Sequence, residues 1–570
     1  MKERYIELME RALSAYSDDD ITRYFNTVRE VGLTEHGFPR LAACIGILIG
    51  HGRRCDLLPV FCEMMELCAD AIPRVEAGNN FSVREILSAI RELDGSGAVD
   101  TVDLARWRGY LREIRPEKCY TICAMSPEDN VRNWALFAAV SESFRMSEGL
   151  CKSEDFIELQ LSTQLRLLDE YGMYMDNESG GGIHHPMTYD LVARGLFALL
   201  LNNGYRGKYY REIDDTIRRA GLLTLDMQSS NGEIAYGGRS NQFIHCEAWL
   251  ACVLEYEAKR YKAEGNTAIS AKFKRAAMRA LDVCEEWLSK SPITHIKNRF
   301  PRNSKYGCEE YAYFDKYMIT VASNLYAAYL VSDDSILPCG DDEAEARTLV
   351  TSPHFHKLFM KSGEYALELD SSADPEYDAS GIGRIHRKGT PSPICLSVPC
   401  PDAHQVGYGY SVDIPDGRAL SICPAVRVDG NWLLGTYEDT IYVIKSHGTD
   451  GTVAFANLGC TLDGEREVGL SIEVSPRGVT LTATHDGDVA IALPAFLFDG
   501  ETRTEIATTD TTVSVKYLGY ECKYEVNGGK IVNTGAVSAN RNGHYLAYLA
   551  IGSGTVGVTV KIERKAEAVG

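Results

Sequence analysis

Gly-Gly-Arg-Ser-Asn-Gln-Phe-Ile-His-Cys-Glu, at residues 237–247, leads from two glycines through polar side chains into an apolar helical run. Two further segments have the same design: Gly-Gly-Gly-Ile-His-His-Pro-Met-Thr-Tyr-Asp at residues 180–190, and Arg-Asn-Ser-Lys-Tyr-Gly-Cys-Glu-Glu-Tyr-Ala-Tyr at residues 302–313. The three segments lie roughly 55 to 65 residues apart, about the length of two helices with their loops. Packing alone does not require His, Tyr, Arg, Asn and Glu at helix starts, so these segments are the candidate functional site.

Three earlier segments continue this rhythm more faintly. Residues 34–38, 79–82 and 129–134 each carry polar or aromatic side chains and each precede an apolar run. The pattern predicts about six helical hairpins of one design, which close into a toroid with the starts of the inner helices at one mouth. An irregular helical solenoid is the alternative interpretation.

The sequence changes character after about residue 335. Strict alternation at residues 479–484 and 512–515, with closely spaced turn signals such as Asn527-Gly528-Gly529, predicts many short antiparallel strands. We therefore expect an N-terminal (α/α)6-type helical toroid followed by a C-terminal antiparallel β-sandwich. The expected units are a catalytic toroid at 1–335, a linker with a capping helix at 336–362, and the sandwich at 363–570.

Composition excludes several classes of protein. A chain of 570 residues is expected to form at least two domains. Its net charge of −21 argues against nucleic-acid binding, and an anionic substrate would need a local basic site. The N-terminus has no apolar signal region and no segment has the length of a membrane span, so we expect a cytoplasmic protein. The 17 scattered cysteines are expected to be free thiols, and neither a metal nor a cofactor is predicted.

The segment at 180–190 offers two histidines and an aromatic hydroxyl. His184, His185 and Tyr189 suit hydrogen bonding to hydroxyl groups or to a carboxylate, with an imidazole available for proton transfer. Asp190 and Arg194 are four residues apart on a predicted helix, so they share a face. The acid is either a catalytic group or half of an intrahelical ion pair.

The segment at 237–247 combines a guanidinium with groups that bind hydroxyls. Arg239 can hold a carboxylate with two hydrogen bonds, and Asn241 and His245 fall on one helical face. Helix capping and a solvated arginine are the alternative explanation. Two acids nearby, Glu233 and Glu247, are further candidates for the site.

The segment at 302–313 sets acids among basic and aromatic side chains. Its candidate residues are Arg302, Lys305, Tyr306, Glu309, Glu310, Tyr311 and Tyr313. A carboxyl beside aromatic surface has a raised pKa, which suits a general acid, whereas a surface acid pair at a helix start is the alternative. In the β region, His404 stands in the polar loop at 401–410, which either reaches the cleft or simply connects strands.

Two of these segments carry a resemblance to known families. The run at 237–247 resembles the (α/α)-toroid β-glucuronidases of glycoside hydrolase family 154. The loop at 402–410, followed by Pro-Asp-Gly-Arg at 415–418, is similar to the His-bearing sandwich loop of heparinase II/III-like and alginate lyases. Both resemblances imply a uronate-active carbohydrate enzyme built from a toroid and a β-sandwich.

The two families imply different chemistry. A hydrolase needs a pair of carboxyl groups across the scissile bond. A lyase needs the uronate carboxylate neutralised and a Tyr or His to remove the C5 proton. The many acids favour an exo-acting hydrolase that releases a terminal uronic acid, expected to be β-glucuronate, from an oligosaccharide. Elimination by a lyase is the alternative, and a non-catalytic glycan-binding protein is the third interpretation.

Each role in the hydrolase has a candidate. Glu310 and Asp190 are the expected acid and base, with Glu233 and Glu309 as further catalytic candidates. Arg239, with Arg302 or Lys305, would hold the uronate carboxylate. The residues expected to bind sugar hydroxyls are His185, Tyr189, Asn241, His245 and Tyr313. The other candidates named above are expected to bind the substrate. We expect no nucleic-acid or membrane partner, and the chain is a possible homo-oligomer.

Overall fold

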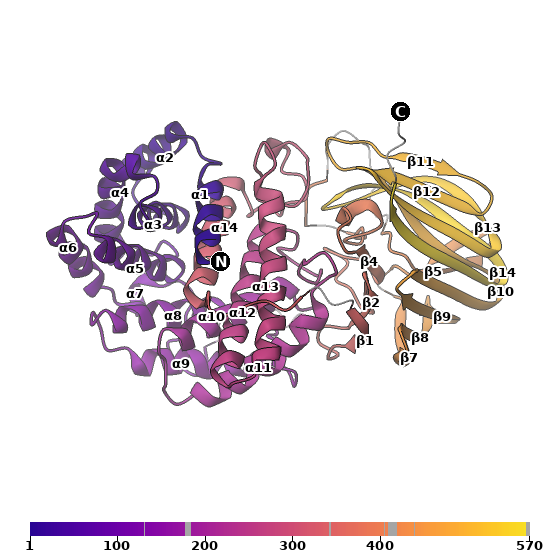
Figure 1. Cartoon of the computed structure of the whole chain (residues 1–570), viewed down its shortest axis with the longest axis horizontal. Helices are drawn as coiled ribbons and strands as arrows, with labels where there is room; N and C mark the ends of the chain where they lie inside the picture. The colour runs from indigo at the N-terminus through magenta and orange to yellow at the C-terminus, as the bar shows by residue number, and fades with distance from the viewer. Residues whose placement is uncertain are drawn as a thin grey trace.

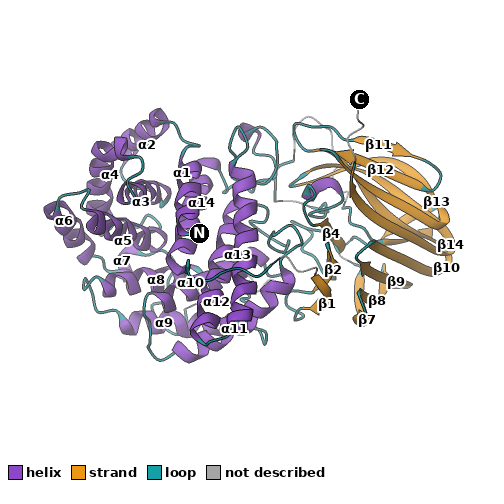
Figure 2. Ribbon diagram, in the orientation of Figure 1, coloured by secondary structure: helices purple, strands orange, loops and turns teal. Residues whose placement is uncertain are grey.

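The computed structural model describes residues 1–129, 132–176, 184–340, 344–403, 405–408, 419–437 and 439–565. A helical N-terminal half stands beside a β-sheet C-terminal half (Figure 1). The last long helix ends at Val331 and the first strand begins at Ala344, so the change from helix to strand falls between them. Figure 2 shows the same division by secondary structure.

Six helices form a closed inner ring. They are α3 (Gly37–Gly50), α5 (Asn79–Ser96), α8 (Trp134–Ser147), α10 (Met187–Asn202), α12 (Ile244–Ala263) and α14 (Phe314–Val331). Each contacts the next, and α14 returns to contact α3. The six polar segments of the sequence lie before or at the starts of these six helices, so the predicted toroid is confirmed.

The inner helices are buried on almost every side, which explains why their sequences are apolar without a polar stripe. In α3, every residue from Gly37 to Ile49 is buried. Helices α10 and α12 also lie very close together at Gly195. A Cβ on Gly195 of α10 would lie 2.3 Å from the ring of Trp249 on α12. Any side chain at that position would force the two helices apart.

The outer helices cover the ring and expose one face each. They are α1 (Lys2–Leu13), α2 (Asp18–Val31), α4 (Leu58–Ala71), α6 (Thr101–Arg112), α7 (Pro116–Cys119), α9 (Glu154–Gln164), α11 (Tyr210–Met227) and α13 (Thr267–Leu288). Capping fixes where some of them begin. Ser17 and Asp20 form a capping box at the start of α2.

The C-terminal half contains two antiparallel sheets. The first has the order β1 (Ala344–Val350), β2 (Lys357–Gly363), β3 (Tyr365–Asp370) and β4 (Gly381–Arg387). The second has the order β11-β12-β13-β14-β10-β9-β8-β7, and β5 pairs with β10 and β6. The strands of this second sheet are β5 (Pro424–Val428), β6 (Asn431–Leu434), β7 (Ile441–Asp450), β8 (Val453–Leu462), β9 (Arg466–Ser475), β10 (Gly478–Phe498), β11 (Glu505–Thr508), β12 (Thr512–Tyr517), β13 (Tyr520–Asn540) and β14 (Gly543–Arg564). Residues of both sheets share one core, so the predicted antiparallel β half is confirmed.

One predicted element is wrong. The capping helix expected within 336–362 is absent from the described residues there, where β1 and the start of β2 stand instead. Leu358, Phe359 and Met360 of β2 are all buried. Because β2 pairs with both β1 and β3, tertiary pairing outweighs the helical propensity of the preceding Glu- and Ala-rich stretch.

Candidate functional site

A cavity of about 370 Å³ opens among the starts of the six inner helices. Every inner helix, or the segment before it, contributes to its wall. The lining residues are His36, Arg40, Phe81, Arg132, Asn133, Trp134, Phe137, Thr188, Tyr189, Val192, Arg239, Ser240, His245, Trp249, Tyr311, Lys316, Tyr317, Thr320 and Asn324. The toroid therefore gathers in one place residues that are nearly 300 positions apart in the sequence.

The cavity is basic although the protein is acidic. Arg40, Arg132, Arg239 and Lys316 line it, and none of the described lining residues is Asp or Glu. Arg40 is paired with the buried Glu85 at 3.0 Å. In a chain of net charge −21, this concentration of cations favours an anionic ligand over a neutral one.

Asp176 ties together two groups that bind carboxylates well. Its fully buried carboxylate accepts hydrogen bonds from Asn133 Nδ2 at 2.8 Å and from Arg239 Nη2 at 3.2 Å. The Arg239 guanidinium also lies over the Tyr189 ring, 4.7 Å from its centroid. An amide, a guanidinium and a phenol hydroxyl are thus held on one side of the cavity.

Three hydroxyl groups form a chain along the same wall. The Tyr189 hydroxyl lies 3.2 Å from Ser240 Oγ, which lies 2.8 Å from the Tyr311 hydroxyl. Burial raises the pKa of Tyr189, while the Arg239 charge and the Ser240 hydrogen bond oppose that rise. Burial also raises the pKa of Tyr311, and the neighbouring Tyr189 and Glu309 raise it further.

The loop that carries Arg239 and Ser240 has a constrained backbone. Ser240 and Gln242 have φ values of 61° and 66°, in the left-handed region that non-glycine residues rarely adopt. The Ser240 N–H donates to Glu309 Oε1 at 2.6 Å, and the Gly238 N–H donates to Asp378 Oδ2 at 2.5 Å. These contacts, one of them to the β half of the chain, fix a conformation that costs energy locally.

The cavity histidines are neutral at neutral pH. Burial lowers the pKa of His245 to about 3 and places the pKa of His36 well below its ordinary value. Of the predicted pair before α10, His185 lies beside the Asp176 backbone, with Nδ1 3.2 Å from its carbonyl oxygen, and His184 packs against His356. Neither His184 nor His185 lines the cavity.

Asp190 and Arg194, predicted as either catalytic or paired, form an ion pair. Arg194 Nη2 lies 2.5 Å from Asp190 Oδ2, and both side chains are buried. The Asp190 carboxylate also accepts the Tyr174 N–H at 2.8 Å. Neither residue lines the large cavity, so the pair stabilises α10 and the turn before it.

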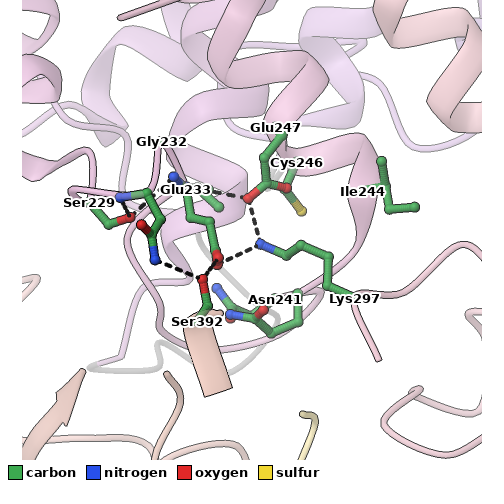
Figure 3. Close-up of polar contacts among 12 residues, drawn as sticks. Ser229, Gly232, Glu233, Asn241, Ile244, Cys246, Glu247, Lys297 and Ser392 are labelled. Atoms are coloured by element: carbon green, nitrogen blue, oxygen red, sulfur yellow. Dashed lines mark hydrogen bonds and ion pairs between the residues drawn. The ribbon is translucent and has the colours of Figure 1, made fainter. Parts of the chain in front are cut away.

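Glu233 and Glu247 belong to a buried ionic cluster between the two halves of the chain (Figure 3). Lys297 Nζ lies 3.1 Å from Glu233 and 2.6 Å from Glu247, and Ser392 donates to Glu233. Burial opposes ionisation of Glu233, but Lys297, His386, Arg384 and the Ser392 hydrogen bond together hold the pKa of this carboxyl well below its ordinary value. Burial raises the pKa of Glu247 despite Lys297. Lys297 thus stands between the two carboxyl groups and neutralises them, although Glu233 also lines a cavity of about 420 Å³. The predicted Asn241 is buried beside them.

The remaining candidates from 302–313 lie elsewhere. Arg302, Lys305, Glu309, Glu310 and Tyr313 line a separate hollow of about 210 Å³. Glu310 is exposed, whereas Glu309 is buried and paired with Arg541. Tyr306 stacks on Phe300 with 3.5 Å between centroids, so it is a packing residue. His404 lies outside the described residues.

Four predicted residues, Tyr189, Arg239, His245 and Tyr311, therefore line the large cavity. Sequence reasoning missed Asn133, Ser240 and Lys316 as site residues, together with Asp176 behind the wall. Asn133 stands in the polar segment at 129–134, the third along the chain, and its place in this segment is the sequence signal that marks it. Within the described residues, no cluster of His, Cys, Asp and Glu suits a metal ion, and no helix is long and apolar enough to cross a membrane.

Comparison with known proteins gives a likeness of fold. No family model matches the chain, and no curated protein matches its sequence. Heparinase III, the BT4657 gene product, superposes with a TM-score of 0.50 at 11% identity, over 93% of this chain and 79% of that one. The chondroitin AC lyase of Streptomyces coelicolor A3, solved with chondroitin sulphate, gives a TM-score of 0.50 at 11% identity, over 100% and 80%. The chain thus has the helical-toroid and β-sheet architecture that both families of the sequence resemblance imply, and the two similar structures are named lyases, as in the second family.

Proposed function

We propose that the protein is a lyase that cleaves a uronate-containing glycan by β-elimination. The observation that carries this proposal is the makeup of the large cavity: Asn133, Arg239 and Tyr189 meet there, and no described lining residue is an acid. This set matches the requirements of elimination, which are neutralisation of a carboxylate and a group to take a proton.

Each residue has a role in this chemistry. Asn133 and Arg239, held by Asp176, would bind the uronate carboxylate and stabilise the charge that develops on it when the C5–H bond breaks. Tyr189, as its phenolate, would accept the C5 proton. The electron pair then forms the C4=C5 double bond, and the C4–O bond breaks.

Hydrolysis has less support from the geometry. It requires two carboxyl groups facing the scissile bond, roughly 5 to 9.5 Å apart. Asp190, Glu233, Glu247 and Glu309 are each buried and held by a cation. Glu310 is exposed in the separate hollow. We therefore place elimination ahead of the glucuronidase activity.

The substrate class follows from charge and architecture together. The basic cavity selects an anionic sugar, and two proteins of similar fold are named heparinase III and chondroitin AC lyase. We infer an acidic polysaccharide, or an oligosaccharide released from one, as the substrate.

The test is incubation with a panel of uronate oligosaccharides, together with a nitrophenyl β-glucuronide. Ultraviolet absorbance of the C4=C5 bond measures elimination, and nitrophenol release measures hydrolysis. We expect unsaturated product from the wild type and almost none from Tyr189→Phe. Tyr171→Phe is the matched control, since Tyr171 is exposed and lines none of the hollows described above. Nitrophenol release without unsaturated product would overturn the proposal.

A further inference from the structure

Ser240 links two tyrosine hydroxyls in the cavity wall. Among the described residues that line the cavity, no other tyrosine hydroxyl is hydrogen-bonded within the wall. Its Oγ lies 3.2 Å from the Tyr189 hydroxyl and 2.8 Å from the Tyr311 hydroxyl. One serine hydroxyl has one proton to donate and two lone pairs to accept with, so it can bond both phenols at once. Elimination that uses Tyr189 as the base leaves open which group protonates the leaving oxygen and how the base recovers.

We propose that Tyr189 and Tyr311 act as a separate base and acid, and that Ser240 returns the proton between them after each turnover. This inference rests on the proposed lyase function and assigns two further catalytic residues to it. Both tyrosines line the cavity, and Tyr311 is 37% exposed at its rim, where a departing sugar can reach it.

The surroundings of the two phenols assign the direction. The Arg239 guanidinium lies 4.7 Å from the Tyr189 ring centroid and stabilises a negative charge there. The cation near Tyr311 is Arg541, which is already bound through both terminal nitrogens to the Glu309 carboxylate, and that carboxylate works against ionisation of Tyr311. The Arg239 contact therefore assigns Tyr189 as the base, ionised for the reaction, and Tyr311 as the acid.

The cycle balances without an external acid or base. The C5–H bond breaks and its proton goes to the Tyr189 oxygen, while the C4–O electron pair stays on the leaving oxygen. That oxygen takes the Tyr311 proton, so Tyr311 becomes the phenolate. Ser240 then gives its proton to Tyr311 and takes one from Tyr189, which restores all three groups.

Contacts within the protein fix the backbone of Ser240. The Ser240 N–H donates to Glu309 at 2.6 Å, and Arg541 grips the same carboxylate through both terminal nitrogens. Ser240 is thus held at φ 61° by contacts within the protein, with its hydroxyl between the two phenols. Strain of this kind, sustained by buried charges, is typical of residues with a functional role.

The first test removes the relay without disturbing that backbone. Ser240→Gly keeps the left-handed conformation, which glycine adopts freely, and deletes the hydroxyl. The first turnover needs no return of a proton, so we expect a burst of about one unsaturated product per enzyme, followed by a steady state roughly 10²-fold slower than wild type. Full steady-state activity, or a slow first turnover without a burst, would overturn the relay.

The second test separates the acid from the base. Tyr311→Phe should lose roughly 10² to 10⁴-fold in kcat on a substrate with a sugar leaving group, and recover on one whose C4 leaving group is a nitrophenolate, which departs without protonation. Tyr189→Phe should be inactive on both substrates. Tyr171→Phe is the control and should match wild type, because Tyr171 is 38% exposed and lines none of the hollows described above. An equal loss for Tyr311→Phe on both substrates contradicts the acid role. Absence of unsaturated product from the wild type would instead refute the lyase function itself.

Discussion

Arg541 donates hydrogen bonds from both terminal nitrogens to Glu309, at 2.8 Å to Oε2 and 2.6 Å to Oε1. The two residues are 232 positions apart, and the pair joins the turn between β13 and β14 to the segment before α14. Glu309 in turn holds the Ser240 N–H. The β half of the chain therefore contributes directly to the shape of a cavity in the helical half.

Breaking this pair should cost both stability and activity. Arg541→Met leaves the Glu309 carboxylate buried without its cation, so we expect the free energy of unfolding to fall by about 3–5 kcal/mol. Denaturant unfolding measures this loss, and kcat/KM should fall as Ser240 loses its anchor. The double variant Arg541→Met with Glu309→Gln removes the buried charge and should recover part of the stability but not the activity. A single variant that unfolds like wild type would contradict a structural role for the pair.

Asp176 offers a test of positioning. Because Asp176→Asn removes a negative charge beside Arg239, it should not weaken the attraction for an anionic substrate. It should misplace Arg239 and Asn133, and a displacement of about 1 Å can cost 10²-fold in rate. We therefore expect kcat to fall about 10- to 100-fold with KM unchanged or lower, measured by steady-state kinetics. Glu128→Gln is the control, because Glu128 is an exposed acid in the segment before α8, a few residues from Asn133. A raised KM with normal kcat would contradict this assignment.

The toroid was predictable because its inner helices are buried on nearly all sides and begin with polar segments. Tyr189, Arg239, His245 and Tyr311 follow from that rule, because starts of inner helices meet at one mouth. The same rule extends to Asn133, whose segment at 129–134 belongs to the same repeat.

The predicted acids show where sequence reasoning fails. An acid four residues before an arginine on a helix gives the same sequence pattern whether the acid is catalytic or paired with the arginine. For Asp190 and Arg194, the burial of the pair distinguishes the two cases. Arg541 and Asp378 carry no local signal, because their partners Glu309 and Gly238 lie far away in the sequence. Long-range pairing decides such roles, and no motif records it.

Glu310 separates the two chemistries in one variant. It is exposed and lies in the separate hollow, so Glu310→Gln should leave elimination unchanged, as measured by the absorbance of the unsaturated product. The hydrolase interpretation, with Glu310 as its acid, requires the opposite result, a loss of about 10² to 10⁴-fold. Thermal unfolding of the variant checks that the fold is intact.

Asp378 should make stability depend on pH in a recognisable way. Burial raises the pKa of its carboxyl to about 7, against about 3.9 in an unfolded chain. Between pH 4 and pH 7 the unfolded chain has released the proton that the folded protein retains. The contribution of this group to stability is therefore complete below about pH 4 and decreases as the pH rises towards 7. The slope for one group is about 1.4 kcal/mol per pH unit.

The variant Asp378→Asn cannot titrate at this position. The free energy of unfolding of the wild type minus that of the variant should therefore fall by this amount per pH unit from about pH 4 to pH 7. Denaturant unfolding across that range measures the difference. A constant difference would show that Asp378 is already ionised in the folded protein, and that the Gly238 N–H binds a full carboxylate charge.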